Sequence, residues 1–240
     1  MSANESAASA RAVLFDVDGT LVDSNYLHVH AWTRAFAEVD IPVAAWRIHR
    51  CIGMDGSTLM STLTGDAPKD VQTHLKDLHS KYYEQTANLL KPLPGARDLL
   101  HRVASLGLQV VLATSAPEDE LTLLRRVLDI DEVLSAVTSS EDVETAKPEP
   151  DIVEIALQRA GVGTDEAVFV GDAVWDVEAC VRAGLRCIGL LSGGFSRGKL
   201  ETAGAVAIFK DAEELLHHLD DSPIGELARA QSGGRQDSPR

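Results

Sequence analysis

Short runs of apolar residues recur along the chain, and each run is followed by a stretch with helical periodicity. The first run, residues 12–15, contains no polar position, which is typical of a strand buried on both faces of a parallel sheet. Between the runs, apolar positions such as Leu99, Leu100 and Val103 fall on one face of a helix. The pattern therefore predicts an α/β fold with a doubly wound parallel sheet, whose ligands bind at the carboxyl ends of the strands. The other predicted strands cover residues 109–113, 133–137, 167–170, 186–190 and 205–209.

The alternation is interrupted between residues 24 and 90, where helical stretches are separated by proline and glycine and no strand pattern occurs. A helical insert directly after the first strand would overhang the strand ends and shield a site there from water. Both ends of the chain are rich in small and charged residues without periodicity, which indicates flexible tails. We therefore expect an α/β core at 11–23 and 91–221, a helical cap at 24–90, and tails at 1–10 and 222–240.

The chain is acidic, because 22 Lys and Arg residues against 37 Asp and Glu residues give it a net charge of −15. This charge repels a phosphate backbone, and no run of five basic residues occurs, so nucleic acid is disfavoured as a partner. Three widely spaced cysteines match neither a disulfide framework nor a zinc knuckle. The first residues lack the apolar stretch of a secretion signal, and no apolar run approaches the roughly 18 residues of a membrane span. We therefore expect a cytoplasmic protein without a membrane partner.

Two aspartates directly follow the first predicted strand, in the run Asp16-Val17-Asp18-Gly19-Thr20. Side chains alternate along an extended chain, so Asp16 and Asp18 point to the same side. Asp16 could act as a covalent nucleophile without a base, while Asp18 could protonate a leaving alkoxide and later accept a proton from water. A calcium loop or a plain turn is the alternative, although the oxygen ligands expected later in a calcium loop are missing.

Two further motifs follow predicted strands. Thr114 and Ser115 lie between the strand at 109–113 and a predicted helix, where a hydroxyl and free backbone N–H groups can bind an anion. A simple helix N-cap is the alternative for this motif. Lys147 is followed by Pro148 and Pro150, which stiffen the chain, and it could supply a positive charge to a phosphate. A solvated surface lysine is the alternative there.

A fourth motif, Gly171-Asp172-Ala173-Val174-Trp175-Asp176, follows the strand at 167–170. Asp172 and Asp176 are four residues apart and therefore share one helical face, and paired carboxylates of this kind suit Mg²⁺. An N-cap aspartate with an unrelated acidic neighbour is the alternative. The four motifs together favour a single site, because the strand ends that carry them converge in a doubly wound sheet.

In their order, the four motifs resemble the signature of the haloacid dehalogenase-like hydrolase superfamily. The matching segments read DVDGT at 16–20, LATSA at 112–116, KPEP at 147–150 and GDAVWD at 171–176. The resemblance implies a Rossmann-like core, a helical cap inserted after the first motif, and Mg²⁺-dependent phosphoryl transfer through an aspartyl-phosphate. Dehalogenation is disfavoured, because the members that displace halide generally lack the second aspartate and the acidic pair of the last motif.

The resemblance also implies a role for each matching residue. Asp16 would be the nucleophile, and Asp18 would be the acid/base and bind the metal through its backbone carbonyl. Thr114 would donate to the phosphoryl oxygens, and Lys147 would hold the nucleophile and the phosphate together. The expected metal ligands are Asp16, Asp18, Asp172 and Asp176, the last of these as a ligand or as a neighbour of one.

Among capped members, the chain looks closest to the branch of phosphoglycolate phosphatases and β-phosphoglucomutases. His28 matches a histidine of the mutases, with a packed or solvated histidine as the alternative. The loop at 51–57 lacks the arginine of the mutases, and the lysine they carry near His79 has no counterpart, which favours a phosphatase. The expected substrate contacts are Gly19, His28, Arg47, Arg50, Asp55, Gly56 and Ser115.

The sequence thus predicts a Mg²⁺-dependent phosphatase that acts on a small phosphorylated metabolite. A sugar-phosphate mutase of the β-phosphoglucomutase type is the alternative. A non-catalytic protein that binds phosphorylated ligands is disfavoured, because a binder has no use for Asp18 as a proton carrier. The expected partner is a small phosphorylated metabolite, and the sequence is compatible with both a monomer and a dimer.

Overall fold

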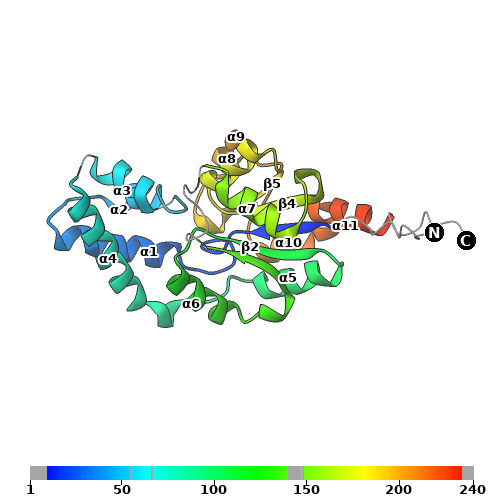
Figure 1. Ribbon diagram of the computed structural model, residues 1–240, viewed down its shortest axis with the longest axis horizontal. Helices are drawn as coiled ribbons and strands as arrows, with labels where there is room; N and C mark the ends of the chain where they lie inside the picture. Colours follow the sequence, from blue (N-terminus) through cyan, green and yellow to red (C-terminus); the bar gives the residue numbers. More distant parts are fainter. Residues whose placement is uncertain (1–9, 55, 66, 140–146, 148, 234–240) are drawn as a thin grey trace, which may run out of the picture.

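The fold is built on one parallel sheet of six strands in the order β3-β2-β1-β4-β5-β6 (Figure 1). The computed structural model describes residues 10–54, 56–65, 67–139, 147 and 149–233. The predicted doubly wound α/β sheet is confirmed, and every predicted strand is present with its limits shifted by at most a few residues. The strands are β1 (Ala12–Phe15), β2 (Gln109–Ala113), β3 (Leu134–Thr138), β4 (Ala167–Gly171), β5 (Cys187–Leu190) and β6 (Ala207–Phe209).

Helices cover both faces of the sheet, so its central strands are buried on both sides (Figure 1). Alternate residues of β1 serve the two faces: Phe15 joins the cluster under one layer of helices, and Leu14 joins the cluster under the other. The first layer contains α5 (Ala96–Ser105), α6 (Glu118–Leu128), α10 (Ala212–His217) and α11 (Pro223–Gly233). The second contains α7 (Asp151–Ala160), α8 (Val174–Ala183) and α9 (Arg197–Ala203).

Between β1 and α5, the described residues form helices and no strand of the sheet. These helices are α1 (Asn25–Glu38), α2 (Ala45–His49), α3 (Gly56–Thr64), α4 (Lys69–Glu84) and the 3₁₀ turn η1 (Ala87–Leu89). We call residues 25–89 the cap segment. It extends to one side of the sheet in Figure 1, and α1 packs along α4. The two connections to the sheet run side by side, since Asp23 N donates to Lys91 O and Leu93 N donates to Leu21 O.

The C-terminal segment corrects one prediction. Residues 222–240 were expected to be a flexible tail, but residues 223–233 form α11, whose Ile224 and Leu227 are almost fully buried. The helix packs near β4, and Glu226 pairs with Arg186 at 2.8 Å. Small and polar residues surround the few apolar positions of this helix, so its composition resembles that of a tail. Residues 234–240 and 1–9 lie outside the described residues.

The remaining short elements are 3₁₀ turns that link helices and strands. They are η2 (Asp131–Val133), η4 (Thr164–Glu166), η5 (Leu191–Gly193) and η6 (Leu219–Asp221). Among the described helices, none combines the length and the apolar character that crossing a bilayer would require.

Candidate active site

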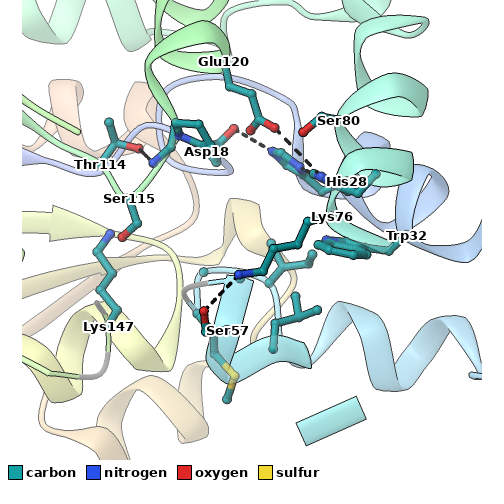
Figure 2. Close-up of a pocket in the computed structure, with 18 of the residues that line it drawn as sticks. Asp18, His28, Trp32, Ser57, Lys76, Ser80, Thr114, Ser115, Glu120 and Lys147 are labelled. Carbon is teal, nitrogen blue, oxygen red and sulfur yellow. Dashed lines mark hydrogen bonds and ion pairs between the residues drawn. The ribbon is translucent and has the colours of Figure 1, made fainter. Parts of the chain in front are cut away.

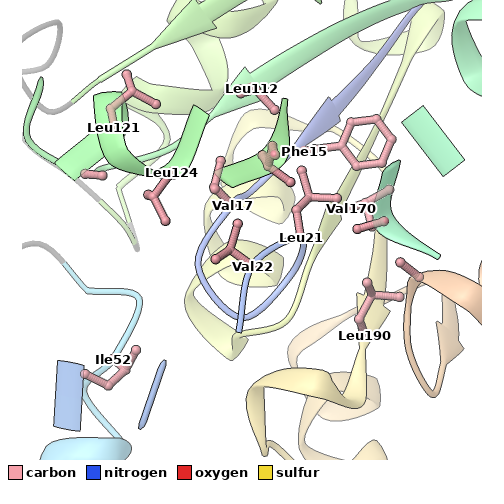
Figure 3. Close-up of a cluster of buried hydrophobic side chains, with 14 of the residues drawn as sticks. Phe15, Val17, Leu21, Val22, Ile52, Leu112, Leu121, Leu124, Val170 and Leu190 are labelled. Atoms are coloured by element: carbon pink, nitrogen blue, oxygen red, sulfur yellow. The ribbon is translucent and has the colours of Figure 1, made fainter. Parts of the chain in front are cut away.

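The loop that follows β1 carries Asp16 and Asp18, and its apolar side chains anchor it in the hydrophobic core. Val17, Leu21 and Val22 are fully buried in the cluster that also contains Phe15 (Figure 3). Because side chains alternate along this extended stretch, burying Val17 turns both aspartates toward the opposite side. The hydrophobic core thus fixes the pair that the sequence predicted to work together.

Three buried carboxylates meet at the carboxyl ends of β1 and β4. Asp16, Asp172 and Asp176 each offer one oxygen, and these oxygens lie within 4.8 Å of one another. Lys147 lies against the group, with its Nζ 2.5 Å from Asp16 Oδ1 and 2.7 Å from Asp176 Oδ1. The structure therefore brings together four residues that the sequence places in three separate motifs.

Asp172 is oriented by two side chains from the β1 loop and the start of α1. Thr20 Oγ1 donates to Asp172 Oδ1 at 2.9 Å, and Asn25 Nδ2 donates to Asp172 Oδ2 at 2.9 Å. A Cβ atom on Gly193 would overlap the Asp172 carboxylate, lying 2.5 Å from its Cγ. Two hydrogen bonds thus hold the Asp172 carboxylate in one orientation, and the backbone of Gly193 lies close to it on one side.

The charges of this group of three carboxylates and one lysine do not cancel. Burial raises the pKa of Asp16 to about 7, although Lys147 opposes the shift. Burial and repulsion from Asp176 and Asp16 raise the pKa of Asp172 well above its ordinary value. Burial opposes the charge of Lys147, but the attraction of Asp16 and Asp176 raises its pKa. Three carboxylates thus face one ammonium group, and oxygen ligands with excess negative charge fit a hard divalent cation such as Mg²⁺.

Asp18 has a different environment from Asp16. Burial opposes its ionisation, but hydrogen bonds from His28 and Ser24 lower the pKa of Asp18 below its ordinary value. Ser24 Oγ donates to Asp18 Oδ1 at 2.5 Å, and His28 Nε2 lies 3.3 Å from the same oxygen. The two aspartates of one motif are therefore set apart, one against a lysine and one against a histidine of the cap segment.

A cavity of about 390 Å³ opens over Asp16, Asp18 and Lys147 and is lined on its far side by the cap segment (Figure 2). Its core side is lined by residues of the first three motifs, namely Asp16, Asp18, Thr114, Ser115 and Lys147. Thr114 Oγ1 accepts a hydrogen bond from Ala116 N at 3.1 Å. Ser115 Oγ is buried without a hydrogen-bond partner among the described residues. This hydroxyl is free to donate to a ligand in the cavity.

The expected substrate contacts divide into two groups. His28 and Gly56 line the cavity together with Ser115, whereas Arg47, Arg50 and Gly19 are not among the lining residues. The Arg50 guanidinium lies over the Trp46 ring, 4.7 Å from its centroid. Asp55 lies outside the described residues.

Sequence reasoning missed several residues that face the cavity from the cap segment and from α6. Lys76 Nζ lies 2.9 Å from Ser57 Oγ (Figure 2). His79 is buried against His28, and Glu120 is buried next to His79. No local pattern marks these positions, because they reach the cavity through the packing of α1, α4 and α6. Lys76 lines the cavity from the cap segment, whereas the expected Arg47 and Arg50 do not.

Residues 13–190 match the sequence family described as haloacid dehalogenase-like hydrolase. The chain belongs to this family. The resemblance expected from the four motifs is thereby confirmed, together with the prediction of a hydrolase. The matched range contains all the motif residues, from Asp16 to Asp176.

Individual haloacid dehalogenase-like relatives agree with this assignment. The phosphorylated carbohydrates phosphatase of Thermotoga maritima is 31% identical over 213 residues, which cover 87% of this chain and 97% of the relative. The phosphoglycolate phosphatase of Escherichia coli K12 is 29% identical over 232 residues, covering 87% and 92%. The crystal structure of a hydrolase from Pseudomonas syringae superposes with a TM-score of 0.84 at 37% identity, covering 88% of this chain and 98% of the other.

Proposed function

We propose that the protein is a Mg²⁺-dependent phosphatase that hydrolyses a small phosphorylated metabolite through an aspartyl-phosphate on Asp16. The observation that carries the proposal is the shared cavity. A carboxylate paired with a buried lysine and a second carboxylate held by a histidine both face it, together with the free Ser115 hydroxyl. The names of the relatives from Thermotoga maritima and Escherichia coli support hydrolysis of phosphate monoesters.

In the first step, a carboxylate oxygen of Asp16 attacks the phosphorus, and the bond from phosphorus to the leaving oxygen breaks. Asp18, whose ionised form His28 and Ser24 favour in the free enzyme, takes up a proton from solvent when the phosphate dianion binds and donates it to that leaving oxygen. In the second step, Asp18 takes a proton from a water molecule whose oxygen attacks the phosphorus. The bond between phosphorus and Asp16 then breaks, which releases inorganic phosphate and restores both carboxyl groups.

Positive charge must accompany these steps. Unit charges about 4 Å apart repel by about 4 kcal/mol at an effective dielectric constant near 20, so Asp16 does not approach a phosphate dianion unaided. Lys147 supplies one charge, and Thr114 and Ser115 donate to the phosphoryl oxygens. Asp16, Asp172 and the backbone carbonyl of Asp18 would hold Mg²⁺. Bound Mg²⁺ neutralises phosphoryl charge and polarises the oxygens it contacts.

Asp176 holds Lys147 in this arrangement. One of its oxygens pairs with Lys147 Nζ, and the other accepts from Ala173 N at 2.9 Å. Both oxygens thus have partners, so we assign Asp176 the task of positioning Lys147 beside Asp16. It remains close enough to Asp16 and Asp172 to contribute its charge to the metal site.

The cap segment completes the proposed site by covering the cavity. His28, Lys76 and Trp32 reach the cavity from it, and such a cover limits the bulk water around the reacting groups while the second step uses one water molecule beside Asp18. The cavity of about 390 Å³ suits a small metabolite. The mutase alternative is not favoured, because the curated relatives described above are named phosphatases.

Release of phosphate from p-nitrophenyl phosphate tests the proposal. We expect turnover with Mg²⁺, loss of turnover with a chelator, and recovery when Mg²⁺ is restored. Asp16→Asn should leave less than about a thousandth of kcat, because the amide cannot form the acyl-phosphate. Asp165→Asn, an exposed aspartate outside the site, is the matched control and should keep full activity. Turnover that survives Asp16→Asn would refute the nucleophile.

A further inference from the structure

Four titratable side chains form a continuous row that leads from Asp18 across the wall of the cavity. Figure 2 labels three of them, Asp18, His28 and Glu120. His28 Nε2 lies 3.3 Å from Asp18 Oδ1, and His28 Nδ1 lies 3.1 Å from His79 Nε2. On the far side, His79 Nδ1 lies 3.9 Å from Glu120 Oε1. The row joins a core loop to α1 and α4 of the cap segment and ends on α6, which belongs to the core.

Aromatic rings hold the two histidines in place. The ring of His28 stacks on Tyr83 with centroids 4.0 Å apart, and the ring of His79 stacks on Trp32 with centroids 4.1 Å apart. All four of these rings are buried. Rotation of either imidazole would break a stack and a hydrogen bond together, so the nitrogen atoms that face each other are fixed by packing.

The hydrogen bonds of the row depend on one another. A neutral imidazole donates from one nitrogen and accepts at the other, so the direction chosen between His28 and His79 fixes what His79 Nδ1 presents to Glu120. A carboxyl group can complete either direction, since it donates when protonated and accepts when ionised. Burial raises the pKa of Glu120 to about 7, so both forms are accessible near neutral pH.

We propose that Glu120 and His79 are positioning residues that act through His28 to orient Asp18 for proton transfer. This inference rests on the proposed function, in which Asp18 is the acid/base. Partners behind a functional side chain commonly fix its orientation and tautomer, as they do behind metal-bound histidines. The 3.9 Å separation at the Glu120 end fits a free enzyme, in which catalytic hydrogen bonds are often long and shorten when substrate binds.

Two aryl phosphates that differ in the basicity of the leaving phenolate separate this role from a structural one. p-Nitrophenyl phosphate releases a weakly basic phenolate that needs little protonation, whereas phenyl phosphate releases a more basic one that depends on an acid. In Glu120→Leu and in His79→Leu we expect kcat/KM for phenyl phosphate to fall about tenfold, while kcat/KM for p-nitrophenyl phosphate changes less than about twofold. The comparison uses kcat/KM because it reports only the steps up to departure of the phenol, whereas kcat also contains the second step, in which Asp18 acts on water with both substrates.

Conservative and control variants sharpen the result. Glu120→Gln keeps a donor and an acceptor and should recover at least half of the lost kcat/KM for phenyl phosphate. Glu118→Leu removes an exposed carboxylate from the same first turn of α6 and should leave both substrates unchanged. The double variant Glu120→Leu/His79→Leu should be no slower than His79→Leu, because both residues act along one row.

Equal losses of kcat/KM on the two substrates, additive losses in the double variant, or no change would each overturn the inference. The first result would make Glu120 and His79 a docking contact between the cap segment and α6. If Glu120→Leu does not unfold cooperatively on heating, it is not properly folded. The two substrates are then compared in His79→Leu and Glu120→Gln instead. Absence of turnover with either substrate in the unaltered enzyme would refute the proposed function instead.

Discussion

The Lys147 ammonium lies 2.7 Å from Asp176 Oδ1, and both side chains are almost completely buried. The same ammonium lies 2.5 Å from Asp16 Oδ1, so one lysine bridges two carboxylates from different motifs. Desolvating such charges is expensive, and a buried pair persists only where each charge keeps its partner. The bridge therefore ties the fold of the site to the placement of the nucleophile.

Replacing Lys147 by Met should destabilise the folded protein by about 3–5 kcal/mol, because Asp16, Asp172 and Asp176 then face one another without a cation. The same change should abolish phosphate release. Added Mg²⁺ should raise the Tm of the variant more than that of the unaltered protein, since a bound cation would restore the missing charge. Thermal unfolding with and without Mg²⁺ measures both effects. Lys69→Met, at an exposed lysine of α4, is the control and should respond to Mg²⁺ like the unaltered protein.

Asp172→Asn should act in the opposite direction on stability. Repulsion from Asp16 and Asp176 is removed, Thr20 can still donate to the new amide oxygen, and Asn25 has a free Oδ1 that can accept from its nitrogen. In the absence of Mg²⁺ we expect a gain of about 1 kcal/mol, or about 2–4 °C in Tm. The rise in Tm caused by Mg²⁺ should vanish together with turnover. If the variant keeps the full rise in Tm with Mg²⁺, Asp172 is not a ligand of the metal.

The sheet could be predicted from the sequence because each strand is marked locally. Residues 12–15 and 167–170 are apolar without interruption, which follows directly from burial on both faces of a parallel sheet. The motif residues Asp16, Lys147 and Asp172 could also be placed near one another, since each follows a strand and the strand ends converge. Local pattern and global topology agree at these positions.

The cap side of the cavity could not be predicted in the same way. Glu120 and Lys76 belong to helices that are distant in the sequence, and their approach to the cavity depends on how α4 and α6 pack. Arg47 and Arg50 have the charge expected of a phosphate contact, yet they do not line the cavity. Charge alone does not report which face of a helix turns inward. The helix α11 was not predicted because it has few apolar residues, and most of its other residues are small or polar.

The backbone of Gly193 lies against the Asp172 carboxylate, where a residue with a side chain would not fit. A Cβ atom there would lie 2.5 Å from Asp172 Cγ, closer than any unstrained contact. Gly193→Ala should therefore displace the Asp172 carboxylate, lower kcat with Mg²⁺ by at least about tenfold and raise the Mg²⁺ concentration needed for half-maximal rate. Steady-state rates across a Mg²⁺ titration measure this change.

The matched control for this substitution is Gly198→Ala, because a Cβ atom at Gly198 meets nothing within 4 Å. It should leave both the rate and the Mg²⁺ requirement unchanged. If Gly193→Ala behaves like Gly198→Ala, the carboxylate can move without loss and its observed position is not required for turnover.

Glu120 should make stability depend on pH. Burial raises the pKa of Glu120 from 4.5 to about 7, with attraction to His28 opposing the shift and repulsion from Asp18 adding to it. The folded chain then holds this proton more tightly than the unfolded chain, so its stability falls as the pH rises from about 4.5 to about 7 and stays lowered above that. Glu120→Gln removes this penalty. We expect its free energy of unfolding to exceed that of the unaltered protein by about 1–3 kcal/mol at about pH 8, with the difference closing near pH 5.

Denaturant unfolding at several pH values measures this difference, and Glu118→Gln provides the control. Glu118 lies in the same turn of α6 but is exposed, so its neutralisation should change stability by less than about 0.5 kcal/mol at any pH. A gain for Glu120→Gln that is equal at pH 5 and pH 8 would show that the carboxyl of Glu120 does not titrate in this range. A gain that grows with pH locates an unfavourable buried charge beside His79, where a neutral side chain of the same shape is better tolerated.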